Sequence, residues 1–396
     1  MSIDLFQAPE RILFGWGSVE KVGEETLRYG AKALLVTGKN SSRASGALDA
    51  VCTSLKSSGI SVTLFCEVES DPSVHTVTAG AALAKETRVD VIVALGGGSP
   101  LDAAKAIGIM ATHPGNIVDY EKAAPTRKGV PVIAVSTTAG TGSEVTKFVV
   151  ITDTERKVKM LIGSPFLIPR VALLDSQLTL SIPPAFTAGP GMDALTHAVE
   201  AYQSSLASPT TDVFALSAIR LIGGNLVKAT LNGTNVEART AMLLGQMHAG
   251  LAFGNASVGL VHAMSRPLGA HFGIPHGQAN AILLPWVMEY NRPACPEKFV
   301  RIAEALGCDV RNLSIKEASQ LAVSTVREIY ADTGLPLTLT ELGIPADAIP
   351  KLAKDAAQSG SVLFNPRKPT VIEIEQLYHF CLTGKQEGSE SHDKSN

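Results

Sequence analysis

Cysteine is scarce in this chain of 396 residues, which contains only five. The number is odd, and no two of the five stand close together in the sequence. Disulfide-stapled domains and zinc knuckles have more cysteines at closer, paired spacings. The sequence therefore argues against a disulfide framework and against a cysteine-based zinc site. It favours a reducing compartment, and we expect a cytoplasmic protein.

The chain also lacks an excess of basic residues, long apolar runs and a secretory signal. Lys and Arg number 34 against 37 Asp and Glu, a formal net charge of −3. Neither nucleic acid nor an anionic membrane surface is therefore expected as a partner. No run of about 18 or more apolar residues occurs, which predicts no membrane span. The N-terminal sequence MSIDLFQAPERILFG has no basic segment followed by an apolar core, so we expect no signal peptide.

The first half of the chain alternates strand-like and helix-like segments. From about residue 30 to 180, short apolar, β-branched runs ending in glycine or hydroxyl residues alternate with stretches of helical spacing. The strand-like runs are AKALLVTG, ISVTLFCEV, DVIVALGGGS and VPVIAVSTTAG. This alternation predicts a parallel sheet with helices on both faces, in an α/β domain spanning residues 1–182. Ligands of such sheets bind beyond the carboxyl ends of the strands.

The second half has a different pattern. Long alanine- and leucine-rich stretches with a period near 3.6 dominate from about residue 185, and strand-like runs all but vanish. We predict an all-helical domain over residues 183–384. The segment SIPPAFTAGPG, rich in proline and glycine, is interpreted as the hinge between the two domains. The polar residues 385–396 are predicted to be a disordered tail.

One aspartate and three histidines form the strongest functional signal. Asp193 and His197 lie four residues apart in GMDALTHAVEAY, so a helix places both on one face. His262 and His276 flank the stretch HAMSRPLGAHFGIPH. The Asp193–His197 pair, together with two histidines that are distant in the sequence, can hold a divalent transition metal and leave a position open for a substrate oxygen. The alternative is that these histidines are hydrogen-bonded core residues.

Two further histidines lie near these motifs. His271 falls between the last two candidate ligands and could reach the same site. His248 lies in the apolar helical pattern AMLLGQMHAGLAF, and we interpret it as a core or subunit-interface residue.

Two glycine-containing stretches follow neighbouring strand-like runs in the first half. GGGSPLDAAKAI begins at Gly96 and runs into a predicted helix, where Ser99 or the following amides could cap the helix and face a pyrophosphate. STTAGTGSEVT, from Ser136 to Thr146, offers small hydroxyl donors. Neither G-x-G-x-x-G nor the P-loop pattern is present. A triple-glycine turn on its own fits tight packing as well as ligand binding, but two such loops at adjacent strand ends reinforce the binding interpretation.

The motifs GGGSPLDAAKAI, TTAGTGSEVT, GMDALTHAVEAY and HAMSRPLGAHFGIPHG resemble, in order and spacing, those of the iron-containing (group III) alcohol dehydrogenases. The resemblance covers roughly residues 5–383. It implies a Rossmann-like dinucleotide-binding domain, an all-α metal-binding domain on a dehydroquinate synthase-like scaffold, and a cleft between them. The positions that it implies are the metal ligands Asp193, His197, His262 and His276; the pyrophosphate contacts Gly97, Gly98, Ser99 and Asp102; the nicotinamide-side contacts Thr137, Thr138 and Thr146, with Lys159 nearby; and the substrate-side residues Phe148 and Phe253.

The sequence departs from the family pattern at two positions. Many members have a second histidine four residues after the one that matches His262, and here that residue is Arg266. It could supply a fixed positive charge near the nicotinamide, or turn away and pair with an acid. Many NAD-using members have an aspartate after the first strand, and here Gly38 stands in its place. Because Lys39 to Arg43 follow as possible phosphate donors, we expect NADP to be favoured over NAD.

The resemblance implies a metal-dependent NAD(P) alcohol dehydrogenase or aldehyde reductase. Hydride would pass between the nicotinamide and an alcohol or carbonyl bound to Fe²⁺, or alternatively Zn²⁺. The partners that we expect are a small alcohol or aldehyde substrate and, in a homo-oligomer, further copies of the chain. The rival hypotheses are a non-redox lyase or cyclase related to dehydroquinate synthase, and a non-catalytic binding protein that retains the fold.

Overall fold

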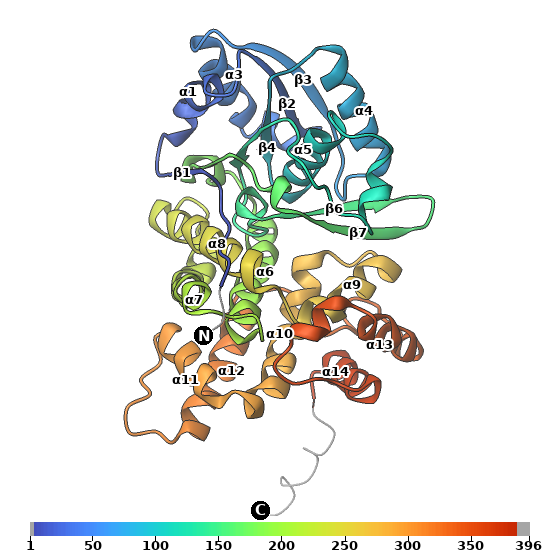
Figure 1. Ribbon diagram of the computed structural model, residues 1–396. Helices are drawn as coiled ribbons and strands as arrows, with labels where there is room; N and C mark the ends of the chain where they lie inside the picture. The colour runs from blue at the N-terminus through green and yellow to red at the C-terminus, as the bar shows by residue number, and fades with distance from the viewer. Residues whose placement is uncertain (1–3, 386–396) are drawn as a thin grey trace, which may run out of the picture.

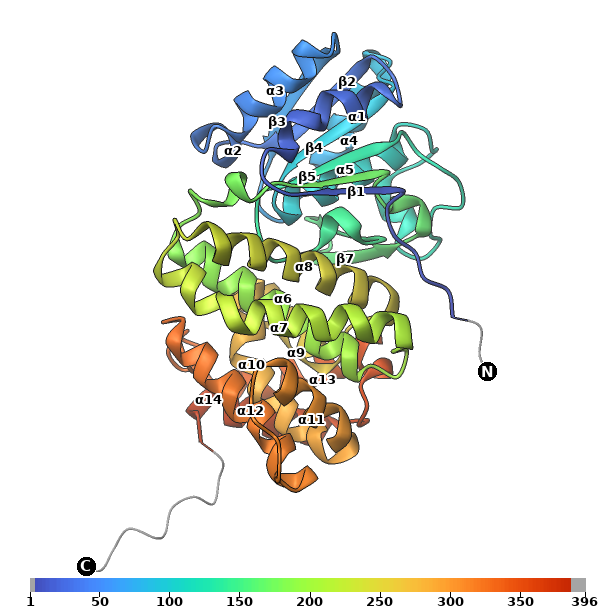
Figure 2. The ribbon, with the colours of Figure 1, turned by 90° about the vertical axis from the view of Figure 1, so that its left-hand side faces the viewer.

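An α/β half and a helical half make up the protein, as the computed structural model shows (Figure 1). The structure describes residues 4–385. Both views place the sheet and its helices at one end and the helical half at the other (Figure 2). The two-part architecture predicted from the sequence is confirmed. The predicted disordered tail, apart from Lys385, lies outside the described residues.

Six parallel strands form the main sheet, in the order β1-β8-β5-β4-β2-β3. The four strands expected from the sequence are confirmed as β2 to β5. The edge strand β1 and its neighbour β8 were not predicted, and each is only four residues long. The bounds are β1 Arg11–Phe14, β2 Lys32–Gly38, β3 Ser61–Val68, β4 Val91–Gly96, β5 Val132–Ser136 and β8 Val171–Leu174.

Helices cover both faces of this sheet. Successive side chains of a strand point to opposite faces, so Leu34 and Val36 of β2 pack with α4 and α5, whereas Ala33 and Leu35 pack with α1 and α3. Because both faces of the sheet are buried, the sequences of these strands are continuous apolar runs. The helices of this half are α1 Val22–Leu27, α2 Ser41–Ala44, α3 Ala47–Ser57, α4 Val74–Glu86 and α5 Gly98–Met110.

A separate antiparallel hairpin lies at the base of the α/β half, beside the helical half (Figure 1). It consists of β6 (Phe148–Asp153) and β7 (Val158–Gly163). The sequence analysis did not predict it. Its first strand is tied to α5, because the backbone N–H of Val150 donates to Asp102 at 2.8 Å.

The helical half is built around α6, whose residues are buried on nearly all sides from Thr187 to its end. α6 packs against α7, α8 and α10. It begins at Pro184, so most of the segment interpreted as a hinge is the first two turns of this central helix. The helices are α6 Pro184–Gln203, α7 Pro209–Leu231, α8 Val236–Ala256, α9 Leu260–Phe272, α10 His276–Asn291, α11 Pro296–Ala305, α12 Ile315–Asp332, α13 Ile349–Ala357 and α14 Val371–Thr383.

Short 3-10 helices connect these elements. They are η1 Ser18–Lys21, η2 Ile117–Tyr120, η3 Ser143–Val145, η4 Pro165–Leu167, η5 Ser176–Thr179, η6 Arg292–Ala294, η7 Ala346–Ala348 and η8 Gly360–Phe364.

Among the described helices, one has the length and apolar composition that could cross a membrane. This helix is α7, with a mean hydropathy of 1.3. It packs against α6 and α8 and has Asp212, Arg220 and Lys228 along its length. Core helices of folded domains meet the same criteria, so a single such helix is weak evidence for a membrane span.

Candidate metal centre and cofactor cleft

The helix α6 supplies the first two candidate metal ligands. Asp193 and His197 lie one turn apart and both are buried. The Nε2 atom of His197 is 3.8 Å from Oδ1 of Asp193. The prediction that the two residues share one helix face is confirmed.

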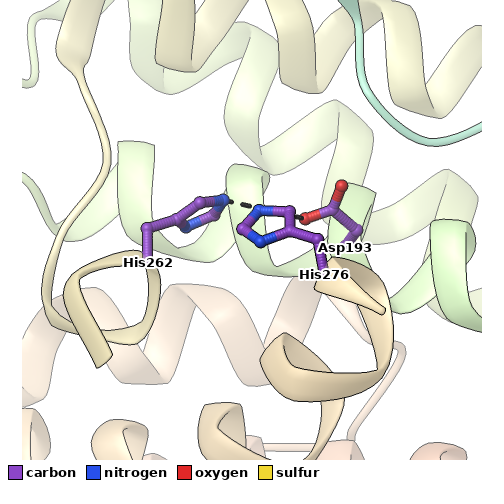
Figure 3. A group of neighbouring side chains, drawn as sticks. All are labelled: Asp193, His262 and His276. Carbon is purple, nitrogen blue, oxygen red and sulfur yellow. Dashed lines mark ion pairs between the residues drawn. The ribbon is translucent and has the colours of Figure 1, made fainter. Parts of the chain in front are cut away.

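Two other helices bring the remaining candidates to the same carboxylate. His262 is near the start of α9 and His276 is the first residue of α10. The Nε2 atoms of both rings lie 3.7 Å from Oδ1 of Asp193. Ligand atoms of Asp193, His262 and His276 all lie within 4.8 Å of one another, and Figure 3 shows the three side chains converging from their helices.

This spacing fits a metal ion. A tetrahedral metal with bonds of about 2.1 Å to nitrogen and oxygen holds neighbouring ligand atoms about 3.4 Å apart. The distances of 3.7 and 3.8 Å from Asp193 to the three imidazoles are close to that value. Three imidazole nitrogens and one carboxylate oxygen suit iron and zinc alike. The arrangement could therefore hold either ion.

A buried carboxylate that the sequence analysis missed orients one of these ligands. Oε2 of Glu200 accepts from Nδ1 of His262 at 2.5 Å, and its Oε1 accepts from the backbone N–H of Val261 at 2.6 Å. With its proton on Nδ1, a neutral His262 presents the Nε2 lone pair toward Asp193. Glu200 lies seven residues after Asp193 on α6, two turns along the same face. The spacing of seven residues between Asp193 and Glu200 in GMDALTHAVEAY was the sequence signal that could have identified Glu200.

Aromatic packing fixes the ring of His197. The ring stacks on Phe253 of α8 with centroids 4.1 Å apart and on His262 with centroids 4.6 Å apart. Its Nδ1 atom is buried and has no hydrogen-bond partner among the described residues. Phe253, predicted to line the substrate side, is thus in direct contact with a candidate ligand.

Burial and mutual attraction set the charges in this cluster. Burial lowers the pKa of His197 to about 4, so its ring is neutral at pH 7. Burial by itself raises the pKa of Asp193, but the three neighbouring imidazoles outweigh it and hold that pKa below its usual value. Burial lowers the pKa of His262, yet Glu200 and Asp193 together leave it raised. An ionised carboxylate and a neutral imidazole are the forms that bind metal.

Three other sequence predictions concern residues near this cluster. Arg266 of α9 donates from Nη1 to Oγ of Ser359 at 2.9 Å. No carboxylate of the described residues lies within 4 Å of its guanidinium, so it forms no direct ion pair, although the more distant Glu200 carboxylate partly offsets the lowering of its pKa by burial. His271 pairs with Asp355 at 2.7 Å and is not part of the ligand cluster. His248 is bonded to Ser217 at 2.9 Å on the neighbouring helix α7.

The glycine turn after β4 packs directly against the loop after β5. A Cβ atom on Gly97 would lie 2.9 Å from Oγ1 of Thr138, and one on Gly98 would lie 2.8 Å from Cγ2 of Thr141. Real Cβ atoms essentially never come that close. Glycine is therefore required here because the two loops touch at the carboxyl ends of adjacent strands.

The predicted cap of α5 by Ser99 is wrong. The N-cap of α5 is Gly97, which makes no side-chain bond, and the hydroxyl of Ser99 instead accepts from the backbone N–H of Asp71 at 3.3 Å. Lys159 of β7 forms an ion pair with the same Asp71 at 2.8 Å. The first amides of α5 are therefore left without a side-chain cap, and Lys159 is linked to this end of the helix through Asp71.

Asp102 and Lys105 of α5 form hydrogen bonds that hold the loop after β5 in place. Asp102 accepts from Oγ of Ser143 at 2.5 Å as well as from Val150. The fully buried Nζ of Lys105 donates to the carbonyls of Ser143, Thr146 and Phe148 at 2.6–3.1 Å. Burial lowers the pKa of Lys105 to about 8. Lys105 was not predicted from the sequence. The signal that could have identified it is a lysine three residues after Asp102 in a run of alanines.

The same loop reaches the helices that carry the candidate ligands. A Cβ atom on Gly140 would lie 2.6 Å from Cβ of Pro190, less than one turn before Asp193. The side chain of Thr146 lies beside Gly254 of α8, the neighbour of Phe253. The loop that contains Thr137, Thr138 and Thr146 thus joins the ends of the strands to the candidate ligands.

Gly38 ends β2 beside the glycine turn. A Cβ atom there would make only ordinary contacts, at 3.6 Å from the Val68 carbonyl oxygen and 3.8 Å from Pro100. Lys39, Asn40, Ser41 and Arg43 after it are exposed, whereas Ser42 is buried and accepts from Thr37 at 2.9 Å. Four of the five expected phosphate donors are therefore accessible, and Ser42 is not.

Comparison with known proteins agrees with this architecture. The description "Iron-containing alcohol dehydrogenase" matches residues 9–176, and "Fe-containing alcohol dehydrogenase family, C-terminal" matches residues 187–382. The chain is 43% identical to a 1,3-propanediol dehydrogenase of Citrobacter freundii over 96% of this chain and 99% of that protein. It is 39% identical to a lactaldehyde reductase of Escherichia coli K12, over 93% and 97% of the two chains. A crystal structure of 1,3-propanediol oxidoreductase superposes with a TM-score of 0.93 at 42% identity, covering 96% of this chain and 100% of that one.

By name, these relatives are a dehydrogenase of a diol and a reductase of an aldehyde, and the matches span both halves of the chain. The protein is an oxidoreductase acting on CH–OH groups, a metal-dependent alcohol dehydrogenase or aldehyde reductase. The lyase and scaffold hypotheses have no support from these relatives. The chain belongs to the iron-containing alcohol dehydrogenase family.

Proposed function

We propose that Asp193, His197, His262 and His276 hold a single divalent metal ion and that the loops after β4 and β5 bind NAD(P) beside it. The observation that carries this proposal is the convergence of three imidazole Nε2 atoms on one carboxylate oxygen at 3.7–3.8 Å. When bound, the metal supplies a Lewis acid for the substrate oxygen and the nicotinamide exchanges hydride with the substrate carbon. Iron is the first candidate for the ion and zinc the second.

The protein's own residues position these groups. Glu200 keeps the proton of His262 on Nδ1. Gly97, Gly98 and the uncapped amides of α5 offer a surface for a pyrophosphate. We assign Ser99, Thr137, Thr138, Thr146 and Lys159 to the cofactor cleft with them. Both carboxylate oxygens of Asp102 already accept bonds from Ser143 and Val150, so we propose that Asp102 acts by holding the two loops together.

The substrate side is proposed to include Phe148, Phe253 and Arg266. The ring of Phe253 stacks on His197, which supports an apolar wall next to the metal. Arg266 lies one turn after His262, and its only hydrogen bond within the described residues is to Ser359. A guanidinium with spare donors and no carboxylate in a direct ion pair supports recognition of a substrate carboxylate or phosphate.

We further propose a preference for NADP, a homo-oligomer and a cytoplasmic location. The absence of a carboxylate at Gly38 and the exposed Lys39 and Arg43 support NADP, because nothing at position 38 repels a 2′-phosphate and the two cations can attract it. Size-exclusion chromatography with light scattering tests the oligomer.

The decisive experiment is metal analysis of the purified protein combined with an absorbance assay at 340 nm. We expect close to one iron or zinc per chain and net nicotinamide turnover with short alcohols or aldehydes. Bound metal and cofactor without net turnover would instead favour the lyase hypothesis.

A matched pair of substrates tests the role of Arg266. Succinic semialdehyde and butyraldehyde have chains of equal length and differ by a carboxylate. We expect Arg266→Ala to lower kcat/KM for succinic semialdehyde about tenfold more than for butyraldehyde. Equal losses for the two aldehydes would remove Arg266 from substrate recognition.

A further inference from the structure

The side chain of Asn280 lies among the candidate ligand atoms and has no part in the function proposed above. Asn280 is one turn after His276 on α10 and is fully buried. Its Nδ2 atom donates to Oδ1 of Asp193 at 2.6 Å, and it lies 3.2 Å from Nε2 of His276 and 3.4 Å from Nε2 of His262. One amide nitrogen therefore contacts atoms of three of the four candidate ligands.

This contact is the one hydrogen bond to the Asp193 carboxylate from a described residue. The imidazoles around Asp193 stand farther away, at 3.7–3.8 Å. Glu200 orients His262 and stacking orients His197, so each of these ligands has its own neighbour that fixes it. Asn280 is the corresponding neighbour of Asp193.

A second observation shows that the amide is turned toward the ligands at a cost. Oδ1 of Asn280 is buried and has no hydrogen-bond partner among the described residues. An unmet buried acceptor is unfavourable, and most buried polar groups avoid it. Flipping the amide would place its oxygen against the ionised Asp193 carboxylate, which accepts hydrogen bonds but donates none. The orientation is therefore imposed by Asp193.

We propose that Asn280 is a positioning residue of the metal centre, which holds the Asp193 carboxylate in the orientation that binds the ion. This inference rests on the proposed metal site. The group acts through its N–H donor, so an apolar side chain of similar size should not replace it. Loss of an outer neighbour of this kind typically weakens metal binding about 10- to 100-fold.

The test measures Co²⁺ affinity on the full-length protein, stripped of metal with a chelator and titrated in competition with a chromophoric chelator. We expect Asn280→Leu to weaken Co²⁺ binding about 10- to 100-fold. We also expect a change in the visible absorption of bound Co²⁺, because the carboxylate no longer has a fixed orientation. Asn280→Ala removes the same donor with a smaller side chain and should behave alike if the leucine variant does not fold.

Asn291 provides a matched control on the same helix. It is fully buried, and its Nδ2 donates to Gln203 and Asn365 at 3.0–3.1 Å. It lies eleven residues after Asn280, about 16 Å along the helix axis. We expect Asn291→Leu to lower the melting temperature without changing Co²⁺ affinity or absorption.

Two results would overturn the inference: unchanged Co²⁺ affinity in the Asn280 variants, or an equal loss in Asn291→Leu. Failure of the underlying metal site is distinguishable, because then wild type and His276→Ala would bind Co²⁺ alike. Wild-type binding that is lost in His276→Ala but retained in both Asn280 variants refutes only the role of Asn280.

Discussion

The two halves of the molecule contribute to the candidate site in opposite ways. In the helical half, rigid and buried helices present side chains: Asp193 and His197 from α6, His262 from α9 and His276 from α10. In the α/β half, the candidate cofactor site is formed by backbone and by the absence of side chains. There Gly97 and Gly98 allow two loops to touch.

This difference determines what each half tolerates. We expect that a candidate metal ligand can be lost without disturbing the fold, since helices such as α6 are held by apolar packing on nearly all sides. A glycine at a loop contact cannot gain even one methyl group without moving its neighbour. We therefore expect opposite sensitivities in the two halves. In the helical half, activity should be lost when a side chain is removed. In the α/β half, it should be lost when a side chain is added.

The largest effect is expected from removing a ligand. Asp193→Ala and His276→Ala should each lose bound metal and reduce turnover at least about a hundredfold, which corresponds to about 3 kcal/mol of transition-state stabilisation. Metal analysis and steady-state rates measure both, and circular dichroism should show an unchanged helical content. A His276→Ala protein with full metal content and near-normal turnover would contradict the ligand assignment.

The next largest effect is expected from adding a single methyl group to the α/β half. In Gly98→Ala the new Cβ would lie 2.8 Å from Cγ2 of Thr141, so the loop after β5 must move. We expect kcat/KM for the nicotinamide cofactor to fall about tenfold or more with metal content unchanged.

Gly224→Ala is the matched control, because a Cβ atom on this α7 glycine meets nothing within 4 Å. That substitution should leave kinetics intact and raise stability by about 0.5–1 kcal/mol in thermal unfolding. Normal cofactor kinetics in Gly98→Ala would show that the loop contact has no functional importance.

The same contrast explains what could be predicted from the sequence. Side-chain chemistry has a recognisable pattern, so the four candidate ligands and the four longer strands of the main sheet were identified, whereas the hairpin of β6 and β7 was not. β1 and β8 were missed because four residues are too few to show a period. Ser99 was misassigned as a cap because its actual partner, Asp71, lies 28 residues away in the chain.

The buried partners of the site were also beyond the sequence analysis. Glu200, Asn280 and Lys105 act through contacts with residues 38 to 87 positions away. Each is a buried polar residue with apolar neighbours in the sequence, which marks it as unusual without identifying its partner. Tertiary packing decides which of such residues face the site.

A smaller effect is expected where the α/β half can accept a side chain without a close contact. A Cβ atom on Gly38 would make only ordinary contacts with its neighbours, so Gly38→Asp should fit without strain. The new carboxylate would repel a 2′-phosphate and accept bonds from a ribose hydroxyl. We expect kcat/KM to shift about tenfold from NADP toward NAD, with metal content unchanged. A wild type that already prefers NAD tenfold would contradict the proposed NADP preference.

The smallest effect concerns Arg266, where the helical half contributes a fixed charge. Arginine stays protonated over the working pH range even though burial lowers its pKa, whereas a histidine has an ordinary pKa of about 6.5. Alcohol oxidation releases a proton, and a neutral histidine could accept it. In Arg266→His we therefore expect kcat/KM for oxidation to rise about threefold between about pH 6 and 8, beyond the wild-type profile. Ser359→Ala removes the hydrogen-bond partner of Arg266 but keeps its charge, and its pH profile should match that of wild type. Superimposable profiles for wild type and Arg266→His, at equal metal content, would show that this position does not take part in proton transfer.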